Sequence, residues 1–153
     1  MISSDFSVVL LPTLACNAAC NYCFEQHRGG SLDHARLEVI VDQLVELARN
    51  QEIKRMSVFW QGGEVTLLSA AWFERAGEIF AERSCDADVE VVHYLQTNLI
   101  GYDRSWNPLI HRMFGGSIGT SLDYPNLYRR PKGGRPEDFF RLWRRGYDEA
   151  LEG

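Results

Sequence analysis

Apolar residues fall into two kinds of segment that alternate along this chain. Short continuous runs, such as SVVLL at residues 7–11 before Pro12, predict buried strands. Longer stretches with apolar residues at helical spacing, such as residues 33–50, predict amphipathic helices with one buried stripe. In chain order, the pattern predicts strands at 7–11, 55–60, 89–98 and 115–123, followed in turn by helices at 33–50, after Ser69, at 105–113 and from Pro136.

A strand followed by a helix, four times over, predicts an α/β fold with a parallel sheet and right-handed crossovers, as in a barrel or a doubly wound sheet. Polar or glycine-rich segments come directly after each predicted strand. The carboxyl ends of parallel strands meet at one edge of the sheet, where α/β proteins build their active sites. We therefore expect one site made by the cysteines after the first strand, QGGE at 61–64, QTN at 96–98 and SLD at 121–123.

Composition and charge narrow the class of protein. With 153 residues, 45% of them apolar and 24% charged, the sequence predicts one soluble globular domain with a real core. No apolar run approaches the roughly 20 residues that cross a bilayer, and the first residues lack the basic segment of a secretory signal. We therefore expect a cytoplasmic protein with no membrane partner. The net charge is −5, and one basic turn at 129–135 in an acidic protein does not predict nucleic-acid binding.

Three of the four cysteines lie close together, in the spacing C-x3-C-x2-C. In a reducing compartment, clustered cysteines indicate metal binding or chemistry rather than disulfides. Cys16, Cys20 and Cys23 suit a [4Fe-4S] cluster, because three thiolates leave one iron open to an outside ligand. They also suit a structural zinc ion with His27 as fourth ligand, although structural zinc usually takes its ligands as two separated pairs. Cys85 stands alone, and we expect it to be a packing residue.

Four segments together resemble those of one known family. CNAACNYC at 16–23, with an aromatic residue before the last cysteine, is similar to the signature of radical S-adenosylmethionine (radical SAM) enzymes. WQGGEVTLL at 60–68 resembles the family's glycine-glycine-glutamate motif. LQTNL at 95–99 and GTSLDYPNLYRR at 119–130 resemble segments of the SPASM-type subgroup, which includes sulfatase maturases and peptide maturases. This resemblance implies a partial TIM-like (βα) barrel of about four parallel βα units, with the active site at the C-terminal edge of the strands.

The resemblance also implies roles for individual residues. Cys16, Cys20 and Cys23 would hold the cluster, and the amino and carboxylate groups of S-adenosylmethionine would chelate its open iron. Asn98 would either contact the cofactor or serve as a turn residue at the strand end, and we expect His93 to be a core or rim histidine. The other implied contacts are Tyr22 near the adenine, Gln61 and Ser121 near the ribose or methionyl part, Gly62, Gly63 and Glu64 at the amino group, and Arg129 or Arg130 at the carboxylate.

By this resemblance the protein is a radical SAM oxidoreductase or peptide maturase, which generates a 5′-deoxyadenosyl radical to modify a peptide or protein. Its electrons would come from a donor such as flavodoxin or ferredoxin. We expect residues 1–153 to be the N-terminal portion of the core domain, without a C-terminal auxiliary-cluster domain. The last strand would then be an open edge, which predicts self-association. Two other classes stay open, namely a module that binds both cofactors without turnover on its own, and a structural zinc-binding domain.

Overall fold

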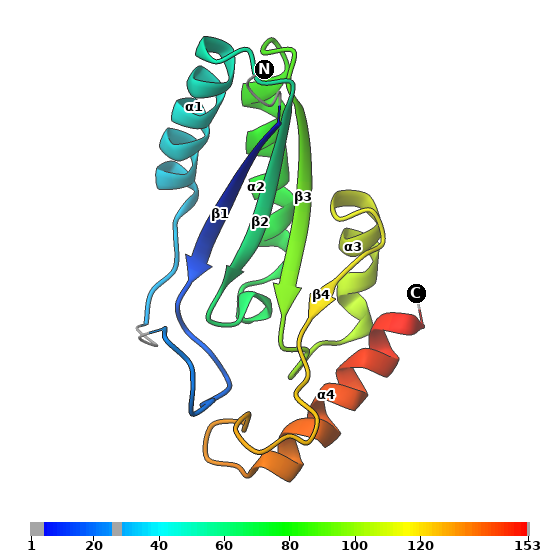
Figure 1. Cartoon of the computed structure of the whole chain (residues 1–153). Coiled ribbons are helices and arrows are strands. Elements are labelled where there is room, and N and C mark those ends of the chain that lie inside the picture. The colour runs from blue at the N-terminus through cyan, green and yellow to red at the C-terminus, as the bar shows by residue number, and fades with distance from the viewer. Residues whose placement is uncertain (1–4, 26–28, 153) are drawn as a thin grey trace.

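Four strands pair in parallel to form one sheet, in the order β1-β2-β3-β4. The computed structural model describes residues 5–25 and 29–152, and Figure 1 shows their arrangement. Because strand order follows chain order with a helix in each connection, the predicted α/β class is confirmed. The strands are β1 (Asp5–Thr13), β2 (Arg55–Gly62), β3 (Glu90–Thr97) and β4 (Gly119–Thr120).

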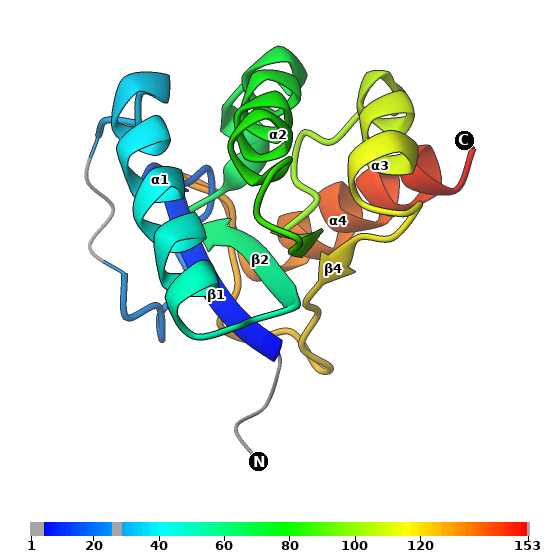
Figure 2. The ribbon, with the colours of Figure 1, turned by 90° about the horizontal axis from the view of Figure 1, so that it is seen from above.

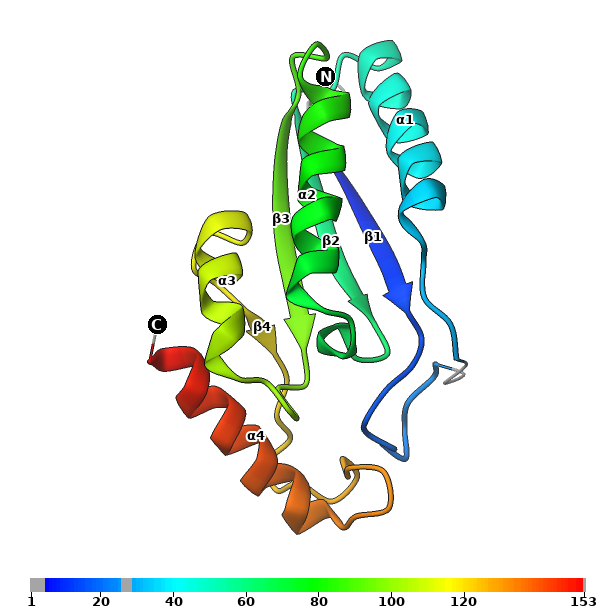
Figure 3. The ribbon, with the colours of Figure 1, turned by 180° about the vertical axis from the view of Figure 1, so that it is seen from behind.

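Three helices, α1 to α3, cover one face of the sheet, as Figures 2 and 3 show from two sides. The side chains of Asp33 and Ser69 cap α1 and α2, because they accept the backbone N–H groups of Arg36 and Trp72. The last helix, α4, instead runs beyond the C-terminal ends of the strands (Figure 1). The helices are α1 (His34–Asn50), α2 (Ala70–Ser84), α3 (Asn107–Met113) and α4 (Pro136–Leu151), with the short 3₁₀ helices η1 (Val65–Leu67) and η2 (Arg104–Trp106).

The core lies between the sheet and these three helices. Met56, Val58 and Trp60 alternate along β2 and are fully buried, as expected for one face of a strand. Trp60 meets Phe73 and Phe80 of α2 edge-on, with ring centroids 5.5 and 6.0 Å apart. Because such contacts fix the helices against one face, the residues between them on β2 must point to the other face.

That other face of the sheet carries an exposed row of apolar side chains. Val9, Phe59 and Tyr94 are partners in the register of β1, β2 and β3, and each is more than a third exposed. The rings of Phe59 and Tyr94 stack with centroids 4.7 Å apart. A parallel sheet with helices on one face and apolar residues on the other is the wall of a TIM-like barrel, whose inner side is the face without helices.

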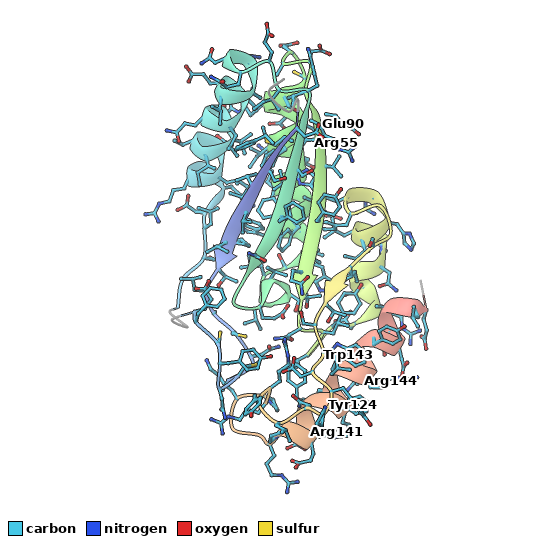
Figure 4. The ribbon with its side chains drawn as sticks, viewed as in Figure 1. Arg55, Glu90, Tyr124, Arg141, Trp143 and Arg144 are labelled. Carbon is cyan, nitrogen blue, oxygen red and sulfur yellow. The ribbon has the colours of Figure 1, made fainter. Side chains whose placement is uncertain are left out.

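Helix α4 is attached to the sheet through two of its residues. The Nε1 atom of Trp143 donates to Thr120 Oγ1 at 3.1 Å. A Cβ on Gly146 would overlap the carbonyl oxygen of Leu99, so only glycine lets the helix approach this closely. Figure 4 labels Trp143 at this end of the molecule, and labels Arg55 and Glu90, which form an ion pair of 3.8 Å, at the opposite end of the strands.

Two expectations from the sequence are corrected by the structure. The predicted strand at 115–123 is reduced to the two residues of β4, because Gly115 and Gly116 adopt positive φ angles of 61° and 72° that no strand contains. Cys85 is exposed at the C-cap of α2 and donates to the carbonyl oxygen of Glu82 at 3.2 Å, so it is not a packing residue.

His93 is a half-buried histidine at the rim of the core, in agreement with the expected core or rim position. Its ring lies 5.1 Å from that of Phe80, and its Nδ1 accepts a hydrogen bond from Trp60 Nε1 at 3.2 Å. Burial lowers the pKa of His93 to about 4, so the imidazole is neutral at pH 7. Within residues 5–25 and 29–152, no helix is both long and apolar enough to cross a membrane.

Candidate cofactor site

The loop that follows β1 brings three free cysteines to one pocket. Cys16 is buried, Cys20 is half-buried and Cys23 is exposed, and all three line a pocket of about 360 Å³ at the C-terminal edge of the strands. The four strand-end segments that the sequence predicted to meet do contribute to it. Besides the cysteines, the predicted residues that line this pocket are Tyr22, Gln61, Gly62, Gly63, Asn98, Ser121 and Arg129.

A short antiparallel pairing holds the cysteine loop in place. Residues 17–21 of the loop lie against residues 128–132, which connect β4 to α4, and Ala18 pairs with Pro131 as an isolated bridge. Because this pairing joins segments more than a hundred residues apart, the fourth βα unit supports the cysteines of the first. The backbone hydrogen bonds are Ala19 N to Arg130 O at 2.8 Å, Asn21 N to Tyr128 O at 3.0 Å and Lys132 N to Asn17 O at 2.8 Å.

Gly62, the last residue of β2, and Gly63 after it allow the cysteine loop to cross close to the end of that strand. Gly63 N donates to Thr13 O at 3.0 Å, and Glu64 N donates to Ala15 O at 2.7 Å. A Cβ on Gly62 or on Gly63 would overlap the carbonyl oxygen of Thr13 or of Ala15, respectively. Gly62 also has a φ of 134°, which favours glycine. Glycine is therefore required at both positions for the close approach of the cysteine loop, and both glycines also expose their backbone to the pocket.

Glu64 lies differently from what the resemblance implied. Its side chain is fully buried and does not line the pocket. One carboxylate oxygen accepts from the hydroxyl and the backbone N–H of Thr66 and from the hydroxyl of Thr97 at 2.6 Å, and the other accepts from Asn98 N at 2.7 Å. Both oxygens are thus engaged in joining the end of β2 to the end of β3. In this structure the Glu64 carboxylate supports the end of β3 and does not face the pocket.

Arg129 and Arg130, which the sequence could not tell apart, point to different places. Arg129 lines the pocket. Its Nε lies 3.0 Å from Asp123 Oδ1 and forms an ion pair with it, but the geometry of this contact is not that of a hydrogen bond. Its guanidinium also lies 5.5 Å from the ring centroid of Tyr22. Arg130 donates instead to the carbonyl oxygen of Ala19 at 3.1 Å, at an exposed position. Of the two, only Arg129 presents its charge to the pocket.

Tyr22, Asp123 and Arg129 form an interacting group at the mouth of the pocket. Tyr22 Oη donates to Asp123 Oδ2 at 2.6 Å. Burial, and then this hydrogen bond, raises the pKa of Tyr22 to about 12. Burial would raise the pKa of Asp123, but the hydrogen bond from Tyr22 and the charge of Arg129 lower it overall. Tyr22 is therefore neutral and Asp123 charged at pH 7.

Burial also raises the pKa of two of the cysteine thiols. For Cys16 the backbone N–H of Ala18, 3.4 Å from Sγ, acts in the opposite direction. For Cys20 the charge of Arg129 does so in part. Metal ligation requires thiolates, so binding at this loop would release protons.

The three cysteines lie around the pocket rather than at a single point. Across residues 5–25 and 29–152, no group of three His, Cys, Asp or Glu side chains is gathered closely enough to hold one metal ion. A four-iron cluster takes each thiolate on a different iron, so its cysteines need to surround a space rather than a point. The space beside the cysteines is bounded by Gly62 and Gly63, where no Cβ intrudes. His27, the fourth ligand of the zinc alternative, lies outside the described residues.

Two residues of the predicted segments QTN and SLD were given no role of their own by the sequence analysis. Gln96 lines the pocket and donates from Nε2 to Ser121 Oγ at 3.1 Å. Its alternation with Tyr94 along β3 places both on the face without helices, which is a signal that the sequence does contain. Asp123 reaches the site only through Tyr22 and Arg129, and no sequence pattern indicates that contact.

Comparison with known proteins shows what this chain resembles. No family model matches it. The cysteine-type anaerobic sulfatase-maturating enzyme of Clostridium perfringens is 27% identical over 124 residues, which cover 75% of this chain and 33% of that enzyme. The serine-type anaerobic sulfatase-maturating enzyme of Bacteroides thetaiotaomicron is 22% identical over 129 residues, which cover 79% of this chain and 31% of that enzyme.

Solved structures agree with these relatives. A histidine-tagged form of anSMEcpe with bound AdoMet (S-adenosylmethionine) superposes with a TM-score of 0.80 at 27% identity, covering 97% of this chain and 41% of that one. Native anSMEcpe with bound AdoMet and Cp18Cys peptide gives a TM-score of 0.71 at 27% identity, covering 93% of this chain and 40% of that one.

The relatives and the solved structures make this chain similar to radical SAM enzymes, and the predicted partial TIM-like barrel is confirmed. More particularly, the homologues of this chain are anaerobic sulfatase-maturating enzymes, which confirms the resemblance recognised in its four motifs. The chain spans about a third of the length of these curated relatives.

Proposed function

We propose that this chain binds a [4Fe-4S] cluster and S-adenosylmethionine as the N-terminal portion of a radical SAM core domain, residues 1–153. One observation carries the proposal. The three cysteines of the loop after β1 line the same pocket as the glycine pair at the end of β2, the end of β3 and Arg129. A thiolate set, an open backbone and a cation around one space suit a cluster together with a small molecule that carries a carboxylate and an amino group.

Each proposed role comes from the family resemblance and is supported by the position of the residue at the pocket. Cys16, Cys20 and Cys23 would each hold one iron, and the pocket next to them would hold S-adenosylmethionine. Gly62 and Gly63, which line the pocket, would present their backbone to the amino group. The further contacts would be Arg129 at the carboxylate, Tyr22 near the adenine, Gln61 and Ser121 near the ribose or methionyl part, and Asn98 at the end of β3.

Bound there, the cluster would supply the electron for reductive cleavage of S-adenosylmethionine, and the radical chemistry so supplied would act on a hydrogen of the substrate. This chain would bind the two cofactors, orient them and exclude water from them. Glu64 would contribute indirectly, because its buried carboxylate accepts the backbone N–H of Asn98 and so fixes the end of β3. Asp123 would also contribute indirectly, because it orients the side chains of Arg129 and Tyr22.

We further propose a peptide or protein as the substrate, modified in an oxidoreductase or maturase reaction. The relatives are named as sulfatase-maturating enzymes, and one similar solved structure holds a peptide. In this chain the exposed row of Val9, Phe59 and Tyr94 continues into the pocket through Leu11 and Gln96. An extended peptide could therefore lie on this face and reach the cofactors. A donor such as flavodoxin or ferredoxin would supply electrons, and the reducing cytoplasm would keep the thiols free.

The proposal is tested by anaerobic reconstitution of the full chain with iron and sulfide, followed by iron and zinc analysis. The wild type and Cys85→Ser should each hold about four irons, because Cys85 is remote from the pocket, whereas Cys20→Ser should lose the cluster. Retention of zinc instead, abolished by His27→Ala, would contradict the proposal and favour the structural zinc alternative. Release of 5′-deoxyadenosine after reduction then separates an enzyme from a module that binds without turnover on its own.

A further inference from the structure

Two asparagine side chains and the backbone of Ile100 form a closed hydrogen-bond network beside Cys16. Ile100 N donates to Asn98 Oδ1 at 2.8 Å, and Asn17 Nδ2 donates to Ile100 O at 2.6 Å. The two amides also meet directly, since Asn98 Nδ2 donates to Asn17 Oδ1 at 2.8 Å. The network connects the cysteine loop to the turn after β3.

This network fixes which way each amide faces. A backbone N–H can only donate and a carbonyl oxygen can only accept, so Ile100 requires the oxygen of Asn98 and the nitrogen of Asn17. Exchange of oxygen and nitrogen in either side chain would place like groups together. The amide nitrogen of Asn98 therefore faces the cysteine loop, where its second hydrogen is directed to Cys16 Sγ at 3.8 Å.

The surroundings of Cys16 make this contact matter. Cys16 is only 8% exposed, and its Sγ also receives the backbone N–H of Ala18 at 3.4 Å. The backbone of Asn98 is held in turn by the buried carboxylate of Glu64, through Asn98 N at 2.7 Å. A hydrogen bond to sulfur in such a shielded place is stronger than one in water. Both hydrogens and the oxygen of the Asn98 amide are engaged, so the amide is held in one orientation.

We infer that Asn98 is a positioning residue that tunes the reduction potential of the bound cluster by donating a hydrogen bond to the sulfur of Cys16. This inference rests on the proposed function. Hydrogen bonds to the ligating sulfurs are one of the factors that set the potential of an iron–sulfur cluster. Reduction adds negative charge, which a donor stabilises, so the Asn98 amide raises the potential and makes the cluster easier to reduce.

Redox titration of the reconstituted full chain, followed by EPR, tests this role. Asn98→Leu removes both donors without adding charge, and Asn98→Asp removes them in a side chain of the same shape. Gln96→Leu and Gln96→Glu are the matched controls, because Gln96 lines the same pocket but donates to Ser121. At the midpoint potential of the wild type, Asn98→Leu should lower the ratio of reduced to oxidised cluster about tenfold, equivalent to about 59 mV for one electron. Asn98→Asp should lower this ratio further than Gln96→Glu does.

The possible outcomes separate this inference from the proposed function. A wild type that assembles no four-iron cluster contradicts the proposed function itself. If the wild type holds a cluster but the Asn98 variants have the same reduction potentials as their Gln96 controls, only the role of Asn98 is overturned. If Asn98→Leu assembles no cluster, the comparison of reduction potentials is made between Asn98→Asp and Gln96→Glu. If neither variant holds a cluster in a folded chain, Asn98 builds the loop rather than tuning it, and the inference is wrong.

Discussion

Replacing Gly63 with alanine should separate the cysteine loop from the end of β2. In the structure this residue lies directly beneath the loop, where Gly63 N donates to Thr13 O and Glu64 N donates to Ala15 O. An added Cβ would overlap the carbonyl oxygen of Ala15 and come within 2.6 Å of that of Leu14. Contacts of a Cβ below 3.0 Å essentially do not occur, so the loop must move away.

The cost can be worked out from the two hydrogen bonds that this movement breaks. They measure 3.0 Å for Gly63 N to Thr13 O and 2.7 Å for Glu64 N to Ala15 O. A typical intramolecular hydrogen bond contributes about 1 kcal/mol net, and a buried group left without a partner costs about 1–3 kcal/mol. We therefore expect Gly63→Ala to lower the free energy of unfolding by about 2–4 kcal/mol. Cluster content should fall with it, since the displaced loop carries all three cysteines of the site.

Urea unfolding of the full chain gives the free energy, and iron analysis after reconstitution gives the cluster content. Gly29→Ala is the matched control, because a Cβ there meets nothing within 4 Å and its φ is not positive. Its free energy of unfolding should change by less than about 1 kcal/mol, in the stabilising direction. Wild-type stability and wild-type iron content in Gly63→Ala would refute this explanation of the glycine pair.

Three further outcomes are expected. The pKa of His93 is about 4 in the folded chain against 6.5 ordinarily, so the unfolded state binds more protons between these values and stability falls by about 3 kcal/mol as the pH drops through them. His93→Gln should remove this part of the pH dependence in urea unfolding, and an unchanged dependence would contradict the cause. Arg129→Lys should weaken S-adenosylmethionine binding to the reconstituted chain about tenfold in calorimetry, whereas Arg130→Lys should not, and equal effects would count against the assignment. The open edge of β4 predicts self-association, which a strictly monomeric species in light scattering would exclude.

The order of elements could be predicted from the sequence because local patterns encode it. Strands β1, β2 and β3 each contain a run rich in apolar residues and the helices that cover them have an apolar stripe, so the order of the βα units and the edge where their strands end follow directly. The fourth strand was overestimated, because an isoleucine at 118 and a leucine at 122 resemble a strand while Gly115 and Gly116 turn the chain away. Backbone conformation, not apolar content, decided its length.

The cysteine loop shows what local patterns leave out. Its spacing predicts the ligands, but its support comes from residues 128–132, and pairing over that separation has no period in the sequence. The same pairing decides between the two arginines, because it directs Arg130 to the carbonyl oxygen of Ala19 and leaves Arg129 facing the pocket.

The orientation of the Glu64 side chain also could not be predicted from the local sequence. A glutamate after two glycines predicts a ligand contact by resemblance, yet its partners, Thr97 and Asn98, come from the next strand. A buried carboxylate is tolerated only where several donors meet it, and their meeting depends on the register of β2 with β3. That register is set by packing across the whole sheet, so the orientation of this one side chain could not be predicted locally.

The central claim is that the pocket beside the three cysteines holds a four-iron cluster whose open iron is met by S-adenosylmethionine. EPR of the anaerobically reconstituted and reduced chain, recorded with and without S-adenosylmethionine, tests this most directly. The account predicts the signal of a reduced four-iron cluster that changes when S-adenosylmethionine is added, and a change that is weakened in Arg129→Lys. A four-iron signal that is identical with and without S-adenosylmethionine, or no cluster at all, would contradict it.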